Sequence, residues 1–225
     1  MKFSLPLKTL KHTRLSSVRN VLSVLLLLFL ANNNFCSAQE RYVKLKNYSK
    51  KIQSEGWLLN DVKVKYWKHY YDTGELNSEG KYEHGKKSGS WKSYRRNGKM
   101  QSIGDYSNDK KAGWWKTYDE EGNIASEGMY KNNLHQGHWK FYASGMTSDD
   151  GYYALGLKTD TWRTYDSLGN ITSEGKYNND KQDDYWMYYV NGKMTSEGAF
   201  IKGLRNGTWK FYDKTGKILR VFNYD

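Results

Sequence analysis

Tryptophan recurs along this chain at a nearly constant interval, and this period constrains the fold more than any other feature of the sequence. The steps between successive members of the series are 24, 24, 24, 23, 24 and 23 residues. A tyrosine follows each of these tryptophans three residues later, then a glycine, then Ser-Glu-Gly or a near copy. A fixed period of about 20–50 residues is typical of repeat architectures. The seven members are Trp67, Trp91, Trp115, Trp139, Trp162, Trp186 and Trp209.

Each period contains two turn motifs, which divide it into two strands. The first is a pair of residues that mostly tolerate positive φ, as a two-residue type I′ hairpin turn requires. The second is the glycine after the tyrosine, whose spacing varies by one residue and accounts for every 23-residue step. The sequence therefore predicts an all-β fold, an elongated single-layer antiparallel meander of about seven β-hairpin repeats. The pairs are Asn60-Asp61, His84-Gly85, Asn108-Asp109, Asn132-Asn133, Leu155-Gly156, Asn179-Asp180 and Lys202-Gly203.

The expected strand register explains why glycine accompanies the aromatic residues. A turn at His84-Gly85 predicts that Gly80 pairs with Gly89, and the next turn predicts that Trp91 pairs with Gly104. Because side chains alternate between the faces of a strand, the tryptophans and glycines then share one face. An aromatic ring that covers a strand glycine is a stabilising arrangement. We therefore expect one sheet to build a thin core from Trp and Tyr.

This aromatic face is also the expected partner-binding surface, provided that the curvature of the sheet leaves it open. It comprises the seven periodic tryptophans together with Tyr82, Tyr106, Tyr130, Tyr153 and Tyr177. Three repeats depart from the pattern, because Lys65, Asp160 and Asp184 replace the glycine two residues before the tryptophan. We expect those three repeats to pack less tightly.

The combination Gly-x-Tyr, an Asn-Gly-like turn and Gly-x-Trp-Lys-x-Tyr resembles the MORN-repeat family. It is most similar to the bacterial MORN variant labelled YwqK-family antitoxin, and the resemblance covers residues 55–225. The resemblance implies an elongated single-layer sheet that acts as a scaffold or adaptor, and some members are proposed to contact phospholipid. Neutralisation of an intracellular toxin fits poorly with the export sequence described next.

Residues 1–38 read as a secretory signal peptide. Five basic residues precede an 11-residue apolar run at 21–31, and small residues stand before the expected cleavage site after Ala38. The run is well short of the ~20 residues that span a bilayer. An uncleaved anchor and a lipid-modified Cys36 are the alternatives. Export to a bacterial periplasm, to the outer envelope surface or out of the cell is therefore expected.

The remaining chain divides into a capping segment at 39–54 and the repeat array with its closing strand at 55–225. In the first segment, Leu45-Lys46-Asn47-Tyr48 imitates Trp-x-x-Tyr. At the other end, residues 218–224 continue the register with Phe222 at the glycine position. Both ends are expected to close the array.

The residues offer little chemistry for catalysis. Cys36, the single cysteine, lies in the signal segment, and no P-loop, dinucleotide or catalytic-serine motif is present. His135 and His138 are the only close histidine pair, and their spacing places them on opposite faces of a strand. We therefore expect no enzyme activity, no cofactor and no metal.

Charge narrows the classes of partner. The net charge of +12, less the five basic residues of the signal, leaves +7. Export argues against nucleic acid, and lysines such as Lys86, Lys87 and Lys92 are expected to solvate the surface. The first hypothesis is a non-enzymatic scaffold that binds a protein partner at the cell envelope. The alternative is a module whose aromatic face binds a carbohydrate, the cell wall or an anionic lipid.

Overall fold

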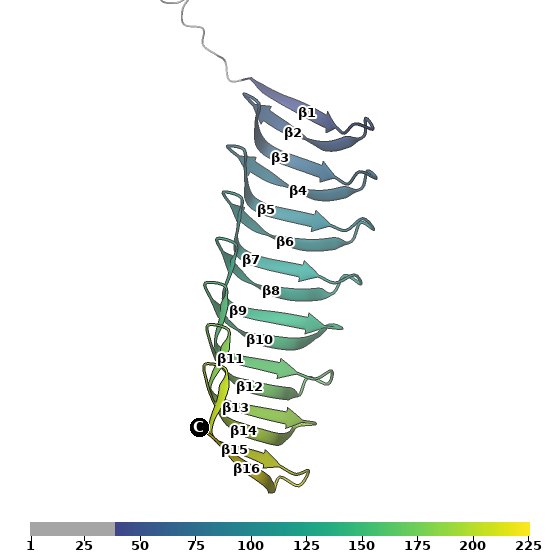
Figure 1. Cartoon of the computed structure of the whole chain (residues 1–225). Coiled ribbons are helices and arrows are strands. Elements are labelled where there is room, and N and C mark those ends of the chain that lie inside the picture. The colour runs from purple at the N-terminus through teal and green to yellow at the C-terminus, as the bar shows by residue number, and fades with distance from the viewer. Residues whose placement is uncertain (1–38) are drawn as a thin grey trace, which may run out of the picture. The chain divides into compact units, whose positions relative to one another are not determined.

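The chain folds into one continuous antiparallel sheet over the part that the structure describes. The structure is a computed structural model that describes residues 39–225, so the expected signal peptide at 1–38 lies outside the described residues. Within the unit Glu40–Asp225, sixteen strands follow one another in sequence order (Figure 1). The predicted all-β, single-layer meander of hairpins is confirmed. No helix among the described residues is long and apolar enough to cross a membrane.

The strands are β1 (Glu40–Lys46), β2 (Ile52–Leu59), β3 (Val62–Tyr70), β4 (Leu76–Glu83), β5 (Lys86–Tyr94), β6 (Met100–Ser107), β7 (Lys110–Tyr118), β8 (Ile124–Lys131), β9 (Leu134–Ala143), β10 (Met146–Ala154), β11 (Leu157–Tyr165), β12 (Ile171–Asn178), β13 (Lys181–Val190), β14 (Lys193–Ile201), β15 (Leu204–Tyr212) and β16 (Ile218–Tyr224). From β3 onward the odd-numbered strands carry the periodic tryptophans, and the even-numbered strands from β2 to β14 carry the glycine of the Ser-Glu-Gly position.

All seven predicted two-residue turns have the geometry that type I′ requires. Both residues of each pair have positive φ, for example His84 at 49° and Gly85 at 78°. The second set of turns differs between repeats, as expected. In the two 23-residue repeats the turn shrinks to Ser144-Gly145 and Asn191-Gly192, again with positive φ at both residues. The deletion is therefore absorbed in the turn, and the strands keep their register.

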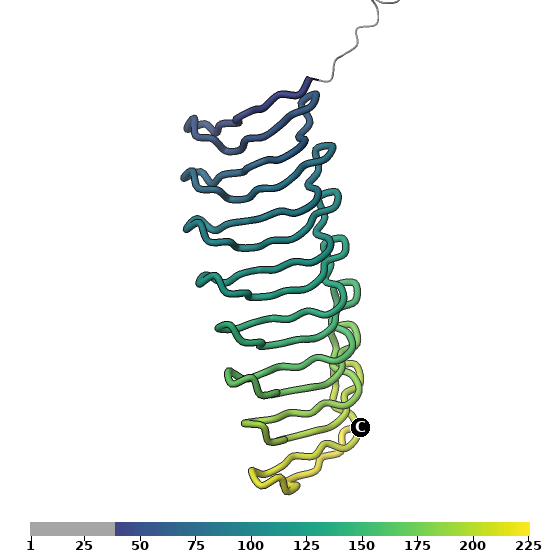
Figure 2. Tube along the Cα trace, turned by 180° about the vertical axis from the view of Figure 1, so that it is seen from behind, coloured from purple at the N-terminus to yellow at the C-terminus, as the bar shows by residue number. Residues whose placement is uncertain are grey.

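The type I′ turns of successive hairpins bind one another. The Gly85 N–H donates to the Lys63 carbonyl at 2.9 Å, and the Asp109 N–H donates to the Lys87 carbonyl at 3.1 Å. The Asp109 side chain accepts a further bond from the Lys87 N–H at 2.7 Å. Figure 2 shows these turns following one another along one side of the sheet. The tips are thus joined by hydrogen bonds in addition to those of the strand ladder.

Across each type I′ turn the predicted register is correct near the turn and wrong farther along the strands, whereas across the second turn of the period it is correct. Gly80 pairs with Trp91 rather than with Gly89, because two extra residues are inserted in β5. Gly89, two residues before the tryptophan, takes the left-handed conformation at φ 63° and creates this bulge. On the other side of β5, Trp91 pairs with Gly104 as predicted. Each tryptophan of the repeat series thus has a glycine or its substitute on both neighbouring strands.

The expected looser packing in the three repeats without this glycine is wrong. Lys65, Asp160 and Asp184 adopt the same left-handed conformation, with φ between 56° and 61°. The tryptophans that follow them are as buried as the others, at 0%, 2% and 3% exposed. Local contacts support the unusual conformation. One example is the Asp160 carboxylate, which accepts the Thr161 N–H at 2.8 Å.

The prediction from the sequence is wrong for the first strand of the array and correct for the last one. Val43, not Leu45, pairs with Gly56 and takes the tryptophan position, and Leu45 and Tyr48 are exposed. The prediction for β1 was therefore shifted by two residues. At the other end Phe222 pairs with Trp209, as predicted.

Candidate functional site

The periodic tryptophans lie flat against the strand that precedes them. A Cβ placed on Gly104 would lie 2.2 Å from Cδ2 of Trp115, a distance that real Cβ atoms do not show. The Trp115 Nε1–H donates to the Asp105 carbonyl at 3.0 Å, and the equivalent bond recurs in the other repeats. Only glycine can therefore occupy the position beneath the ring. The indole is held there by packing and by its hydrogen bond.

Tyrosines join neighbouring tryptophans into one continuous stack. Tyr106 stands edge-on to Trp91, with ring centroids 6.0 Å apart, and to Trp115 at 5.2 Å. Trp91 and Trp115 consequently share a face, as the sequence predicted. We call this surface the tryptophan face. Residues 39–225 form a single sheet with no second sheet packed against it, and the stack forms its core.

The predicted partner-binding residues are mostly buried on this face. Trp67, Trp91, Trp115, Trp139, Trp162, Trp186 and Trp209 are at most 3% exposed, and Tyr82 is 8% exposed. Tyr106, Tyr130, Tyr153 and Tyr177 are half-buried. The structure thus brings all twelve residues together, but the indoles present almost no area to a partner. Partner binding through this face stays a prediction, and it would use the tyrosine edges.

A row of cations covers the stack. The Lys87 ammonium lies 4.2 Å from the Trp91 ring centroid and 5.0 Å from that of Tyr106, rather than in solvent as predicted. Burial lowers the pKa of Lys87, and it lowers the pKa of Lys63 and Lys111 in the same way. These contacts are favourable cation–π interactions. Lys158 and Arg205 cover their tryptophans similarly.

The opposite face repeats a different contact, between the tyrosine three residues after the tryptophan and a carboxylate. The Tyr94 hydroxyl donates to Glu79 at 2.7 Å, and Tyr142 donates to Glu127 at the same distance. This bond lowers the pKa of Glu127, and burial together with the carboxylate raises the pKa of Tyr94 to about 12. The further pairs are Tyr70–Glu55, Tyr165–Asp150 and Tyr212–Glu197.

Sequence reasoning missed the exposed aromatic residues of this opposite face. Trp57 is 36% exposed and Trp114 is 50% exposed, although tryptophan is seldom left in water. A signal for them was present, because the chain has nine tryptophans and only seven fit the period. Residues outside a structural period are free to serve another purpose.

The exposed aromatic residues nearest the start of the array form a small patch. Tyr42 stands edge-on to Trp57 with centroids 5.6 Å apart, and Tyr66 is 49% exposed on the same face. The Lys65 ammonium lies 5.0 Å from the Trp57 ring centroid. We call Tyr42, Trp57 and Tyr66 the N-terminal patch.

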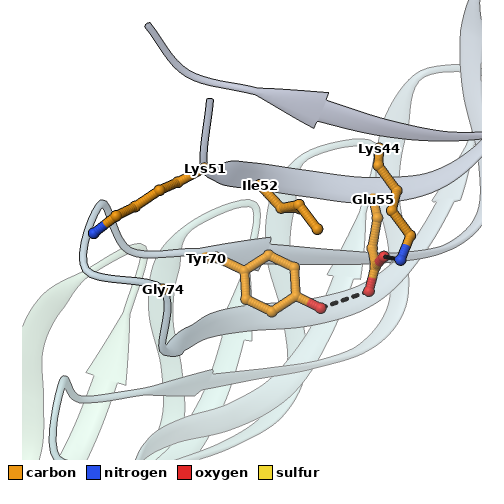
Figure 3. A pocket seen from close by; sticks show the side chains of 6 residues that line it. All are labelled: Lys44, Lys51, Ile52, Glu55, Tyr70 and Gly74. Atoms are coloured by element: carbon orange, nitrogen blue, oxygen red, sulfur yellow. Dashed lines mark hydrogen bonds and ion pairs between the residues drawn. The ribbon is translucent and has the colours of Figure 1, made fainter. Parts of the chain in front are cut away.

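A cleft of about 460 Å³ lies on the same face near this patch (Figure 3). Tyr70 donates to Glu55 at 2.6 Å inside it, and Lys44 forms an ion pair with the same carboxylate at 3.3 Å. The Tyr70 bond is the main cause of the lowered pKa of Glu55. Lys51 and Ile52 complete the lining together with Gly74. The cleft therefore combines a compensated charge with an apolar wall, which suits a protein side chain better than a free ion.

The two histidines of the close pair lie on opposite faces, as predicted. The His135 ring contacts Trp139 at 4.0 Å between centroids on the tryptophan face. The His138 Nε2 lies 2.9 Å from a carboxylate oxygen of Asp150 on the opposite face. In residues 39–225, no group of three or more metal-ligating side chains gathers around them. They cannot act together on one ion.

Comparison with known families agrees with the repeat seen in the strands. The family model for the MORN repeat variant matches residues 63–84, 87–108, 113–132 and 205–225. A domain of unknown function, DUF4430, matches residues 163–211. No curated protein matches the sequence significantly. The four matched segments each span one hairpin turn or the closing strand, in the same register as the unmatched repeats, so MORN-variant repeats are present in this chain.

Proposed function

We propose that this protein is exported and acts without catalysis as a scaffold that binds another protein at the cell envelope. The observation that carries the proposal is the contrast between periodic and non-periodic side chains. The periodic tryptophans are buried in internal packing, and most of the tyrosines three residues after them donate hydrogen bonds to carboxylates. The exposed aromatic rings instead stand mostly at two positions whose residue type varies between repeats, the one before the periodic tryptophan and the one after the glycine of the Ser-Glu-Gly position. Repeat proteins commonly combine a constant frame with variable contact positions.

The N-terminal patch is the proposed anchor for the protein partner. Trp and Tyr are enriched among the residues that dominate binding energies at protein interfaces. Tyr42 packs against the Trp57 ring and Lys65 lies near it, so these contacts hold the ring in place. The exposed part of the ring is an apolar surface on which a partner can pack. Lys44 and Lys65 stand near it, but each forms an ion pair with a carboxylate of this chain, so the rim of the patch is polar and its charge is compensated. Exported repeat arrays of net positive charge would also be drawn toward acidic envelope surfaces.

The experiment that tests this function is affinity capture from the native envelope. The wild-type protein and Trp57→Ala are each cross-linked in intact cells, purified and analysed by mass spectrometry. We expect one protein to be enriched with the wild type and reduced at least about fivefold with Trp57→Ala, because loss of an interface anchor costs more than about 1 kcal/mol. Leu168→Ala is the matched control, since Leu168 is 80% exposed in a turn far from the patch.

Three results contradict the proposal. Equal capture by the wild type and Trp57→Ala would remove the N-terminal patch from the interface. Recovery of the full-length chain with residues 1–38 intact in the cytoplasm would remove export. A measured turnover that survives removal of every contaminating protein would contradict the non-catalytic role.

A further inference from the structure

A row of four side chains, three of them exposed, crosses four consecutive strands in the middle of the array. Trp114 on β7 pairs with Met129 on β8, and His138 on β9 pairs with Tyr152 on β10. Trp114, Met129 and Tyr152 are 50%, 45% and 44% exposed. All four lie on the face opposite the tryptophan face. We call them the mid-array row.

An open cleft of about 340 Å³ lies beside Tyr152 at one end of this row. Its lining is His138, Asp150, Tyr152, Asp160, Thr161 and Arg163, all of which carry hydrogen-bonding groups. The ring centroids of His138 and Tyr152 are 4.9 Å apart, so the tyrosine ring forms one wall. A polar cleft with a single aromatic wall differs from the apolar pocket that holds most drug-like ligands.

The polar groups of the cleft are fixed in place by bonds to one another. Asp150 accepts from the Tyr165 hydroxyl at 2.8 Å and lies 2.9 Å from the His138 Nε2. Asp160 accepts the Thr161 N–H with one oxygen, at 2.8 Å, and its other oxygen has no hydrogen-bond donor within the described part of the chain. Asp160 holds a left-handed conformation at φ 56°, where four other repeats have glycine.

Charge in this region is largely compensated. Arg163 forms an ion pair with Glu174, and Lys116 forms one with Glu127 at 3.2 Å. The cations that cover the tryptophans lie on the other face of the sheet. A polyanion would therefore find few uncompensated positive groups along the row and would meet the carboxylate of Asp160. The ligand that suits these groups is neutral.

We propose that the mid-array row and its cleft form a binding site for a neutral, extended oligosaccharide. A pyranose ring presents aliphatic C–H groups on one face, which can lie on the electron-rich face of Tyr152 or Trp114. Its hydroxyls both donate and accept, which matches the mixture of donors and acceptors from Asp160, Thr161 and Arg163. Trp114 and Tyr152 stand three strand spacings apart, about 14 Å, so a single sugar cannot reach both. A chain of several sugar units laid across the strands can.

The inference goes beyond the proposed protein scaffold and does not depend on it. The N-terminal patch lies on β1–β3, and the mid-array row lies on β7–β10. The N-terminal ring Trp57 has Tyr42 and Lys65 against it, whereas the cleft beside Tyr152 is open and polar. One chain can thus hold a protein partner and a glycan at separate places.

The test is direct titration of the purified full-length protein with two neutral probes, cellohexaose and the hexamer of N-acetylglucosamine. Binding is followed by calorimetry and by tryptophan fluorescence. We expect one of the two probes to bind, with affinity reduced about tenfold or more in Tyr152→Ala and in Trp114→Ala, the loss expected for an aromatic anchor. Tyr185→Ala is the matched control, because Tyr185 is 44% exposed on the same face but outside the row, and its affinity should equal that of the wild type.

A second readout does not depend on the alanine variants. Bound hexasaccharide should protect Trp114 from quenching by acrylamide, and this protection should disappear in Trp114→Phe. No binding of either probe, or binding that Tyr152→Ala and Trp114→Ala leave unchanged, overturns the proposal. Polygalacturonate serves as a third, anionic probe. If the protein binds only this probe and salt abolishes the binding, the proposal is also overturned, since the anionic ligand would then be held by the cations of the other face.

Discussion

Replacement of Gly104 by alanine tests directly whether the indole needs bare backbone beneath it. Gly104 has an ordinary extended φ, so alanine meets no backbone strain there, and the added methyl group is the only change. That methyl group would lie 2.2–2.5 Å from three ring atoms of Trp115. The ring must move by about 1 Å to restore normal contact distances of 3.4–4 Å. Such overpacking costs about 1–3 kcal/mol.

Movement of the ring has a second cost. The Trp115 Nε1–H lies 3.0 Å from the Asp105 carbonyl, and a shift of about 1 Å breaks that bond. Loss of a hydrogen bond of this kind adds about 0.5–1.5 kcal/mol. We therefore expect Gly104→Ala to lower the free energy of unfolding by about 2–4 kcal/mol, measured by urea denaturation with circular dichroism.

The control and the double variant make this prediction specific. Trp115→Leu alone is destabilising, but adding Gly104→Ala to it should cost far less than in the wild type, because the flexible leucine can move away. The difference is a coupling energy of the kind that double-mutant cycles measure. If Gly104→Ala leaves the urea midpoint unchanged, or if the two substitutions add independently, the glycine is not there to admit the ring.

Leu155 is 73% exposed with φ 52°, so Leu155→Asn should raise the free energy of unfolding by about 0.5–1 kcal/mol in the same urea assay. Tyr94→Phe should lower the free energy of unfolding by about 1–2 kcal/mol, because it removes the hydrogen bond to Glu79. Tyr118→Phe should lower it little, because the chain has isoleucine at the corresponding carboxylate position. Equal losses in the two variants would contradict this prediction. Burial, with the positive charges of two neighbouring lysines, lowers the pKa of His69 from 6.5 to about 4, so its contribution to stability is present above pH 6.5 and is lost as the pH falls toward 4. The urea midpoint of unfolding should therefore be lower at pH 4.5 than at pH 7. The decrease should be smaller in His69→Ser, which introduces the residue that the next repeat carries at this position.

Most of the fold could be predicted from the sequence, because the repeat period marks the positions of the turns and strands. Seven copies of the same turn pair place the hairpins, and the glycine at 104 already implied a ring above it. The bulge could not be predicted by counting from the turns, because a left-handed glycine such as Gly89 looks the same in sequence as an extended one such as Gly80. Only the requirement that Trp91 have a small residue on both neighbouring strands would have fixed the register.

The candidate sites were harder to predict for a physical reason. Sequence shows which face an aromatic residue takes, but not whether its neighbours cover it. Trp91 and Trp114 are the same residue type on successive tryptophan-bearing strands, yet one is 3% exposed and the other 50%. Their difference lies in position: Trp91 faces a glycine and a covering lysine, while Trp114 faces Met129 on the other side of the sheet.

The contacts between successive hairpin tips have a consequence for how such a protein can change its reach. Within residues 39–225, each tip bonds only to the tips of the adjacent hairpins, and each strand pairs only with the strands next to it in the sequence. Duplication of one unit of 24 residues would therefore lengthen the array by about 10 Å, two strand widths, and leave the other units undisturbed. An extra unit inserted between the strand of Trp57 and the strand of Trp114 would move these two residues apart by that fixed distance. The spacing between molecules bound at the two places would therefore change in fixed steps.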